Sequence, residues 1–220
     1  MAETVFKKVD YTLGVLLSDI RLGRIGLPDL QRPFVWKNAK IRDLFDSLYR
    51  GYPVGYLLFW QTDADGAAHQ IGVDGKQLEP SHLIVDGQQR LTALYAVTRG
   101  EKVIREDYTP ETIDISFCPL DGTFEVADAA TRNDPRFIAS ITTLFADKVS
   151  LFRILGDYLG RLDNARAQAG EEVTAEERQA AELGIQRLAG LTGFPFTALV
   201  LDSSIDEEQV GEVFDGQRQK

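Results

Sequence analysis

Residues 81–97 of the chain read SHLIVDGQQRLTALYAV, and the hydrophobic pattern changes its period at Asp86-Gly87. The residues before this point, from His82 to Val85, have the character of a β-strand. After it, apolar residues recur at helical spacing as far as Arg99-Gly100, a basic residue and a glycine of the kind that end helices. We therefore expect a strand, a tight turn and a helix that has Gln88, Gln89 and Arg90 in its first turn.

Such a turn suits an anion. The first N–H groups of a helix have no partner within the helix, and the helix dipole makes this end positive. Gly87 would let a ligand approach the backbone, Arg90 would bind phosphate oxygens in a bidentate manner, and Asp86 would hold a cation or a water molecule. The same spacing also fits a plain strand–helix connection, with Asp86 as the N-cap and Gly87 as the turn residue.

A second stretch, residues 27–36, reads LPDLQRPFVW. It is too rich in proline for regular structure, yet it carries several large apolar side chains. We expect it to be pinned to the body of the protein, which would hold Gln31 and Arg32 with little freedom, as a binding site requires. The alternative is a surface turn in which Arg32 is solvated and Trp36 belongs to the core.

The composition bounds the function. The chain has 220 residues, 44% of them hydrophobic, and a net charge of −10. Because domains that grip nucleic acid are usually basic, extensive DNA binding by this chain alone is disfavoured. The single cysteine, Cys118, excludes an internal disulfide and a cysteine-based zinc site. There is no apolar run of membrane-spanning length and no signal-peptide pattern, so we expect a cytoplasmic protein.

The remaining pattern predicts an α+β fold. Helices are expected at residues 11–22, 39–50, 141–145, 151–159, 161–189 and 205–214, with Asn38 as an N-cap, a break near Gly170 and a capping box at Thr174. Strands are expected at residues 54–60, 68–73, 113–117, 123–126 and 196–201, with a turn at Asp74-Gly75 and a charged connector at residues 102–110. The division we predict is an α/β part at residues 1–130 and a helical part at residues 131–220 with a late strand.

Two blocks together carry a family resemblance. Residues 28–36, PDLQRPFVW, followed by Tyr52-Pro53-Val54-Gly55, resemble the opening of the N-terminal domain of GmrSD-type modification-dependent restriction enzymes. Residues 85–92, VDGQQRLT, resemble the signature of that family. The order and the spacing of the blocks match, and the resemblance extends over roughly residues 10–214.

The resemblance implies a small mixed sheet with helices, similar to the ParB/sulfiredoxin superfamily. It implies binding or hydrolysis of a nucleoside triphosphate with Mg²⁺, coupled to nuclease action on phage or modified DNA. The nucleotide-binding residues would be Gln31, Arg32, Gly87, Gln88, Gln89, Arg90 and Thr92. The catalytic residues would be Asp86, Gln89 and Arg90, with Asp86 also holding the metal.

The chain departs from the family pattern in two respects. The family continues after a segment like Glu212-Val213-Phe214 with a basic residue, an apolar residue and an asparagine, whereas this chain has Asp215-Gly216-Gln217-Arg218 and stops. We therefore expect a third element of the site to be missing or the chain to be truncated. The second departure is the lack of the HNH-type nuclease domain that often follows. Sulfiredoxin-like chemistry is set aside because Cys118 is not in the central turn.

The sequence is compatible with several functions. The leading hypothesis is a triphosphate-hydrolysing domain, in which Gln31, Gln88 or Gln89 orients the attacking water. The alternatives are a nucleotide sensor that regulates a separate nuclease subunit, and a direct endonuclease. DNA would be reached through a partner nuclease, no membrane partner is expected, and a homodimer stays open. His82, at the start of the strand, is interpreted as structural, and His69 as solvated.

Overall fold

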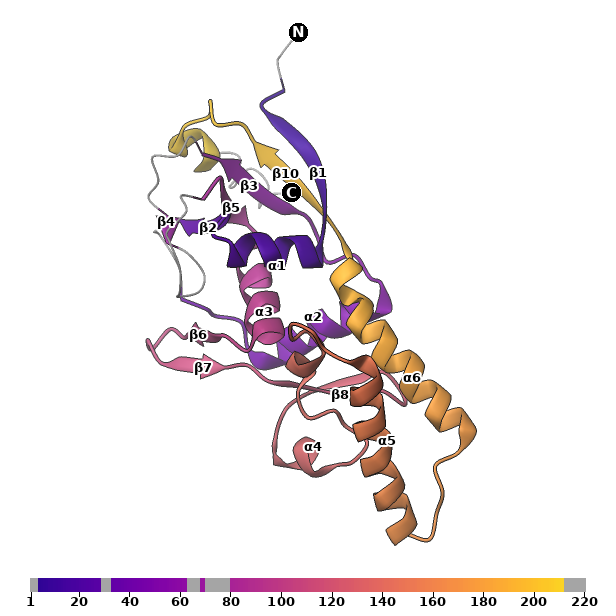
Figure 1. Ribbon diagram of the computed structural model, residues 1–220. Coiled ribbons are helices and arrows are strands. Elements are labelled where there is room, and N and C mark those ends of the chain that lie inside the picture. Colours follow the sequence, from indigo (N-terminus) through magenta and orange to yellow (C-terminus); the bar gives the residue numbers. More distant parts are fainter. Residues whose placement is uncertain (1–3, 29–32, 63–67, 70–79, 212–220) are drawn as a thin grey trace. The chain divides into compact units, whose positions relative to one another are not determined.

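The computed structural model describes residues 4–28, 33–62, 68–69 and 80–211, and it confirms the predicted α+β class (Figure 1). The chain forms two units. The first comprises Met1–Phe34, Gly55–Thr92 and Thr192–Lys220, and the second comprises Val35–Val54 and Ala93–Leu191. Each unit is therefore assembled from separate stretches of the chain, and residue 130, where we predicted a division, lies inside the second unit.

A mixed sheet forms the centre of the first unit. In the described residues its strands have the order β1-β10-β3-β5-β2-β4. Their bounds are Phe6–Thr12 for β1, Pro195–Leu201 for β10, Leu57–Gln61 for β3, His82–Asp86 for β5, Ile25–Pro28 for β2 and Ala68–His69 for β4. The late strand β10 is antiparallel to β1 and parallel to β3. It therefore lies between the first strand of the chain and a strand at the centre of the sheet.

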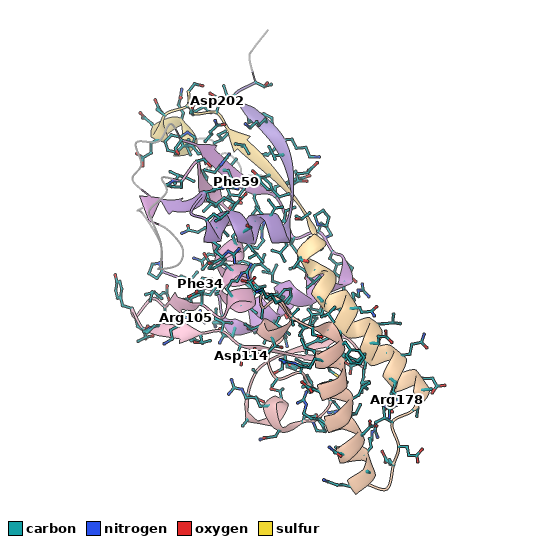
Figure 2. All side chains as sticks on the ribbon, viewed as in Figure 1. Phe34, Phe59, Arg105, Asp114, Arg178 and Asp202 are labelled. Carbon is teal, nitrogen blue, oxygen red and sulfur yellow. The ribbon has the colours of Figure 1, made fainter. Side chains whose placement is uncertain are left out.

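The side chains of β3 alternate between the two faces of the sheet, as strand geometry requires. On one face Phe59, which is fully buried and labelled in Figure 2, meets the rings of Tyr11 and His82 edge-on, with centroids 6.0 and 6.2 Å away. On the other face Leu58 packs with Leu201 and with apolar residues of the segment that follows β10, namely Ile205 and Val210. Because Phe59 and Leu58 point to opposite faces and both are buried, both faces of the sheet are covered at β3.

The structure corrects the start of the chain. We predicted a helix over residues 11–22, but residues 6–12 form β1 and helix α1 covers Leu13–Arg21. The hydroxyl of Thr12 caps α1 by accepting a hydrogen bond from the N–H of Val15 at 3.4 Å. Tyr11 is thus a strand residue, and its ring packs edge-on against Phe59.

In the second unit, helix α2 (Asn38–Arg50) packs on the hairpin formed by β8 (Ile115–Cys118) and β9 (Thr123–Val126), as Figure 1 shows. The ring of Tyr49 meets Phe117 and Phe124 edge-on, with centroids 5.2 and 5.5 Å away. This hairpin was predicted. Asn38 was predicted as the N-cap of α2, but Lys37 holds that position, and the Asn38 amide instead donates to Glu111 at 2.8 Å.

The rest of the second unit is mainly helical. Helix α5 covers Leu151–Gln168 and α6 covers Ala175–Ala189, with α4 at Ala129–Asn133, the 3₁₀ helix η1 at Ile141–Leu144 and the 3₁₀ helix η2, which begins in this unit, at Gly190–Gly193. The predicted capping box of α6 is confirmed, because Thr174 and Glu177 exchange hydrogen bonds. The predicted connector at residues 102–110 is wrong, since Lys102–Ile104 (β6) and Pro110–Thr112 (β7) pair as a hairpin.

Three of the predicted elements extend beyond the described residues. Of the strand predicted over residues 68–73, Ala68–His69 form β4 and the rest lies outside them, as does the predicted turn Asp74-Gly75. A helical turn covers residues 207–211, within the helix predicted over residues 205–214, whose remaining end is also outside. None of the helices in the described parts of the chain combines the length and the apolar character needed to cross a membrane.

Candidate functional site

The predicted strand–turn–helix is present, and its strand, its turn and the first turn of its helix belong to the first unit. Strand β5 ends at Asp86, Gly87 makes the turn with φ +91°, and helix α3 (Gln88–Arg99) begins at the next residue. The carbonyl of Gly87 accepts the first helical hydrogen bond, from the N–H of Leu91 at 2.9 Å. The capping position therefore belongs to a residue without a side chain, and the alternative in which Asp86 is the N-cap is wrong.

Two N–H groups in the first turn of α3 are available to a ligand. Among the described residues, the backbone N–H groups of Gln88 and Arg90 have no hydrogen-bond partner. Gly87 is fixed by two constraints. Its positive φ disfavours any side chain, and a Cβ atom there would collide with the Cδ2 atom of Leu57. The turn is thus packed against Leu57, and the positive end of the helix dipole lies directly after it.

Arg90 lies in the first turn of α3, and its side chain runs back toward the start of the helix. Its Nη1 atom donates to the carbonyl of Tyr56 at 2.9 Å. Within the described residues no carboxylate forms an ion pair with it. Burial lowers the pKa of Arg90 from its ordinary value, while the charge of Asp86 acts in the opposite direction. Because arginine stays protonated in proteins, the site holds a half-buried cation.

Gly55 is a site residue that our prediction did not assign. It has φ +87°, and a Cβ atom built on it would lie 3.2 Å from Nη2 and 3.5 Å from Nη1 of Arg90. The guanidinium therefore rests against the backbone at Gly55-Tyr56, just before β3. The signal was available in the sequence, because Gly55 ends the block Tyr52-Pro53-Val54-Gly55 that carries part of the family resemblance.

Gln89 connects the start of α3 to the proline-rich stretch. Its side-chain amide donates to the carbonyl of Pro33 at 3.3 Å. The next residue, Phe34, is 4% exposed and is labelled in Figure 2. The expectation that this stretch is pinned to the body of the protein is met at Pro33 and Phe34. Gln31 and Arg32 themselves lie outside the described residues.

The remaining predicted residues, Asp86 and Thr92, lie on either side of the Arg90 turn. Asp86 is exposed at the end of β5, and Thr92 is half-buried one residue after Leu91. Among the described residues no group of three or more His, Cys, Asp or Glu side chains stands together as a metal site would require. Asp86 alone is suited to a cation that takes most of its other ligands from a bound phosphate and from water.

His82 and Cys118 do not belong to this site. His82 sits at the start of β5, its Nδ1 atom 2.9 Å from the hydroxyl of Ser81. Burial, and secondarily the charge of Lys7, lower the pKa of His82 and favour the neutral ring. Cys118 is buried in β8 of the second unit.

The arrangement is suited to an anion with several oxygens. Among the described residues it combines two backbone N–H groups without a partner at the start of a helix and an arginine without a carboxylate partner. A phosphate group can accept from all of these donors at once, whereas a single carboxylate would leave donors unused.

Comparison with known proteins supplies the context of this geometry. The family described as the GmrSD restriction endonuclease, N-terminal domain, matches residues 13–217. A stretch of 82 residues is also 32% identical to the uncharacterized protein MJ0686 of Methanocaldococcus jannaschii. That match covers 33% of this chain and 14% of the archaeal protein, so the chain corresponds to a small part of it.

Proposed function

The chain belongs to the family of GmrSD restriction endonuclease N-terminal domains, and from this premise we propose that it binds a nucleoside triphosphate with Mg²⁺ at the start of α3 and hydrolyses it. A role in a restriction system follows from the family. The finer proposal is that triphosphate turnover serves the action of a partner nuclease subunit or domain on phage or otherwise modified DNA.

One observation carries the proposal, the state of Arg90. Its guanidinium is half-buried, is held by the carbonyl of Tyr56 and the backbone of Gly55, and makes no ion pair among the described residues. A structural arginine in such surroundings is usually neutralised by a carboxylate, because desolvating an unpaired charge is unfavourable. A bound phosphate would supply the missing negative charge.

Mg²⁺ would be held by Asp86 and by the phosphate oxygens, with water completing its coordination. When bound, the ion would neutralise phosphate charge and orient the oxygens. A single exposed carboxylate suffices for this task, since Mg²⁺ in nucleotide sites commonly keeps several waters and takes ligands from the nucleotide.

The residues of the chain would then act by position and charge. Phosphoryl transfer spreads negative charge over the oxygens of the transferred group, and Arg90 and the open N–H groups of Gln88 and Arg90 would stabilise that charge. The amide nitrogen of Gln89 is engaged by Pro33. We therefore assign Gln89 the role of holding residues 33–34 beside the helix start, and leave Gln88 and Gln31 as the candidates that orient water.

The test is calorimetric titration with ATP, GTP, CTP and UTP in the presence of Mg²⁺, followed by phosphate-release assays with every triphosphate that binds. Removal of a charge-assisted bidentate contact should weaken binding at least about tenfold in Arg90→Ala. Arg90→Lys keeps the positive charge but loses the fork geometry of the guanidinium, so its affinity for the triphosphate should lie between those of the wild type and Arg90→Ala.

The control is Arg50→Ala, which removes an exposed arginine paired with Asp46 on α2 and should leave binding unchanged. A folded Arg90→Ala protein with the affinity and turnover of the wild type would reject the role of Arg90 and, with it, the proposed site.

A nucleotide sensor is the second candidate, and the Gln89–Pro33 hydrogen bond favours it. This bond joins the helix start to the proline-rich stretch, so a nucleotide that moved Gln89 would also move the segment after Arg32. Binding without phosphate release in the pure protein, accompanied by a change in protease protection around residues 33–36, would support the sensor over the hydrolase.

A further inference from the structure

Strand β1 forms one edge of the sheet of the first unit. It is seven residues long, it pairs with β10 along its whole length, and no other strand of the described residues lies on its outer side (Figure 1). Phe6, Lys7, Lys8 and Asp10 are exposed, while Val9 and Tyr11 are half-buried. Such an edge presents unpaired backbone groups that another strand can take up.

The hydrogen bonds at the two ends of β1 reveal which residues face outward. The N–H of Asp202 donates to the carbonyl of Val5 at 3.0 Å, and the N–H of Leu13 donates to the carbonyl of Phe194 at 2.9 Å. Both pairs continue the register in which Phe6 is opposite Leu201. In an antiparallel ladder hydrogen-bonded pairs alternate with non-bonded ones. The odd residues of β1 therefore bond to β10, and the even residues turn their N–H and C=O groups to the outer edge.

This alternation restricts how a second copy could pair. Across a two-fold axis the strands run antiparallel, and each outward residue must face an outward residue. The register centred on Val9 meets this condition and overlaps the full strand. It places Lys8 opposite Asp10 of the second copy, and Asp10 opposite Lys8 of the second copy. Registers displaced to neighbouring centres place Lys8 opposite itself or Asp10 opposite itself, which is unfavourable.

We propose that the chain forms a two-fold symmetric dimer by antiparallel pairing of β1 with β1 of a second copy, centred on Val9. The inference does not depend on nucleotide binding. Lysines on an edge strand ordinarily discourage such pairing. Here Asp10 lies on the same face as Lys8, with its Oδ1 atom 3.6 Å from the Nζ atom of Lys8. Only the register centred on Val9 places each of these lysines opposite an aspartate of the second copy. The two Val9 side chains would meet at the centre, where the strands approach most closely.

The test uses charge reversal and sedimentation equilibrium of the full chain over a range of concentrations. Lys8→Asp places two carboxylates opposite each other, and Asp10→Lys places two ammonium groups opposite each other. Each variant should weaken the dimer at least about tenfold. An equimolar mixture of the two variants should form a heterodimer, and the double variant K8D/D10K should regain the affinity of the wild type.

The matched control is Lys7→Asp. Lys7 carries the same charge on the same strand, but its backbone bonds to β10 and it would face Tyr11 of the second copy rather than a charged residue, so dimer affinity should change little. Far-UV circular dichroism on every variant separates loss of pairing from loss of fold.

Amide hydrogen exchange gives a second readout at single residues. Exchange at Lys8 and Asp10 should slow as the protein concentration rises, whereas exchange at Val9 and Tyr11, bonded to β10 within one chain, should not depend on concentration. A monomer at every concentration, a dimer insensitive to both single reversals, or a mixture that forms no heterodimer would overturn the proposal.

Discussion

Two glycines determine where Arg90 lies. Gly87 allows the turn that starts α3 and leaves no room for a side chain above Leu57, and Gly55 lets the guanidinium rest on the backbone before β3. Both have positive φ, a conformation that other residues adopt only with strain. The cation is therefore positioned by backbone rather than by a carboxylate among the described residues, which leaves its charge available to a ligand.

Gly55→Ala tests this positioning. The added methyl group would lie 3.2 Å from Nη2 of Arg90, so the guanidinium should shift and triphosphate affinity should fall at least about tenfold. Gly51→Ala is the matched control, because Gly51 also has positive φ but a methyl group added there would meet nothing within 4 Å. Both variants should lose about 1–3 kcal/mol of unfolding free energy through backbone strain. Equal nucleotide affinity in the two variants, measured by calorimetry, would contradict the role of Gly55.

Cys118 illustrates a residue whose chemistry is suppressed by its surroundings. Burial raises the pKa of the Cys118 thiol to about 11. Because the thiolate is the reactive form, alkylation of the folded protein at pH 8 should be at least about a hundredfold slower than in urea, where the thiol has an ordinary pKa. The rate should keep rising with pH up to about 11, as long as the fold persists. Mass spectrometry of iodoacetamide labelling measures this, and rapid labelling of the native protein at pH 8 would contradict it.

At the scale of elements, secondary structure was predicted best where the period of the hydrophobic pattern changes at a turn residue. The strand–turn–helix at residues 82–99 and the hairpin around Gly122 were predicted because Gly and Asp mark their turns and the flanking apolar residues are buried. The capping box of α6 was also predicted, because Thr174 and Glu177 form it within four consecutive residues and no distant contact is needed.

The elements that were missed depend on tertiary contacts. β1 carries charged residues at Lys7, Lys8 and Asp10, and its partner β10 is almost two hundred residues away, so no local signal identifies it as a strand. The β6–β7 hairpin was taken for a connector because it is charged, yet Arg105 within it donates to the carbonyl of Trp36 and to Asn38, both at 2.5 Å, tying it to the start of α2. Gly55 stands in a block that carries part of the family resemblance, but its closeness to Arg90 could not be predicted because that contact exists only in the folded chain.

Thr174→Ala tests how much the capping box at the start of α6 contributes to the stability of the protein. The hydroxyl of Thr174 accepts from the N–H of Glu177 at 3.2 Å, and the Glu177 carboxylate accepts from the N–H of Thr174 at 3.0 Å. Loss of the hydroxyl leaves a helix N–H unsatisfied, so the unfolding free energy in urea should fall by about 1 kcal/mol. Thr174→Ser keeps the hydroxyl and should stay close to the wild type; an equal loss in both variants would assign the effect to the methyl group instead.

At the scale of the whole molecule, neither unit is a continuous piece of the chain. The first unit takes its residues from three stretches, and the second takes its residues from two. Strand β10, from the third stretch of the first unit, lies between β1 and β3 from the first and second stretches. We therefore expect the sheet that carries the candidate site to form only when residues 195–201 are available, although the site residues themselves end at Thr92.

A fragment of residues 1–130 tests this dependence. It contains every predicted site residue but lacks β10, so β1 loses the partner it pairs with from Phe6 to Thr12, β3 loses its parallel neighbour, and Leu58 loses Leu201, Ile205 and Val210 as cover. We expect no cooperative thermal transition by circular dichroism and no dispersed amide spectrum. The control is the full chain cut at a protease site inserted between Glu171 and Glu172, in the exposed connection from α5 to α6 within the second unit, which should keep its transition because no strand is removed. A 1–130 fragment that unfolds cooperatively and binds triphosphate would mean that the site needs neither β10 nor the helical part of the chain.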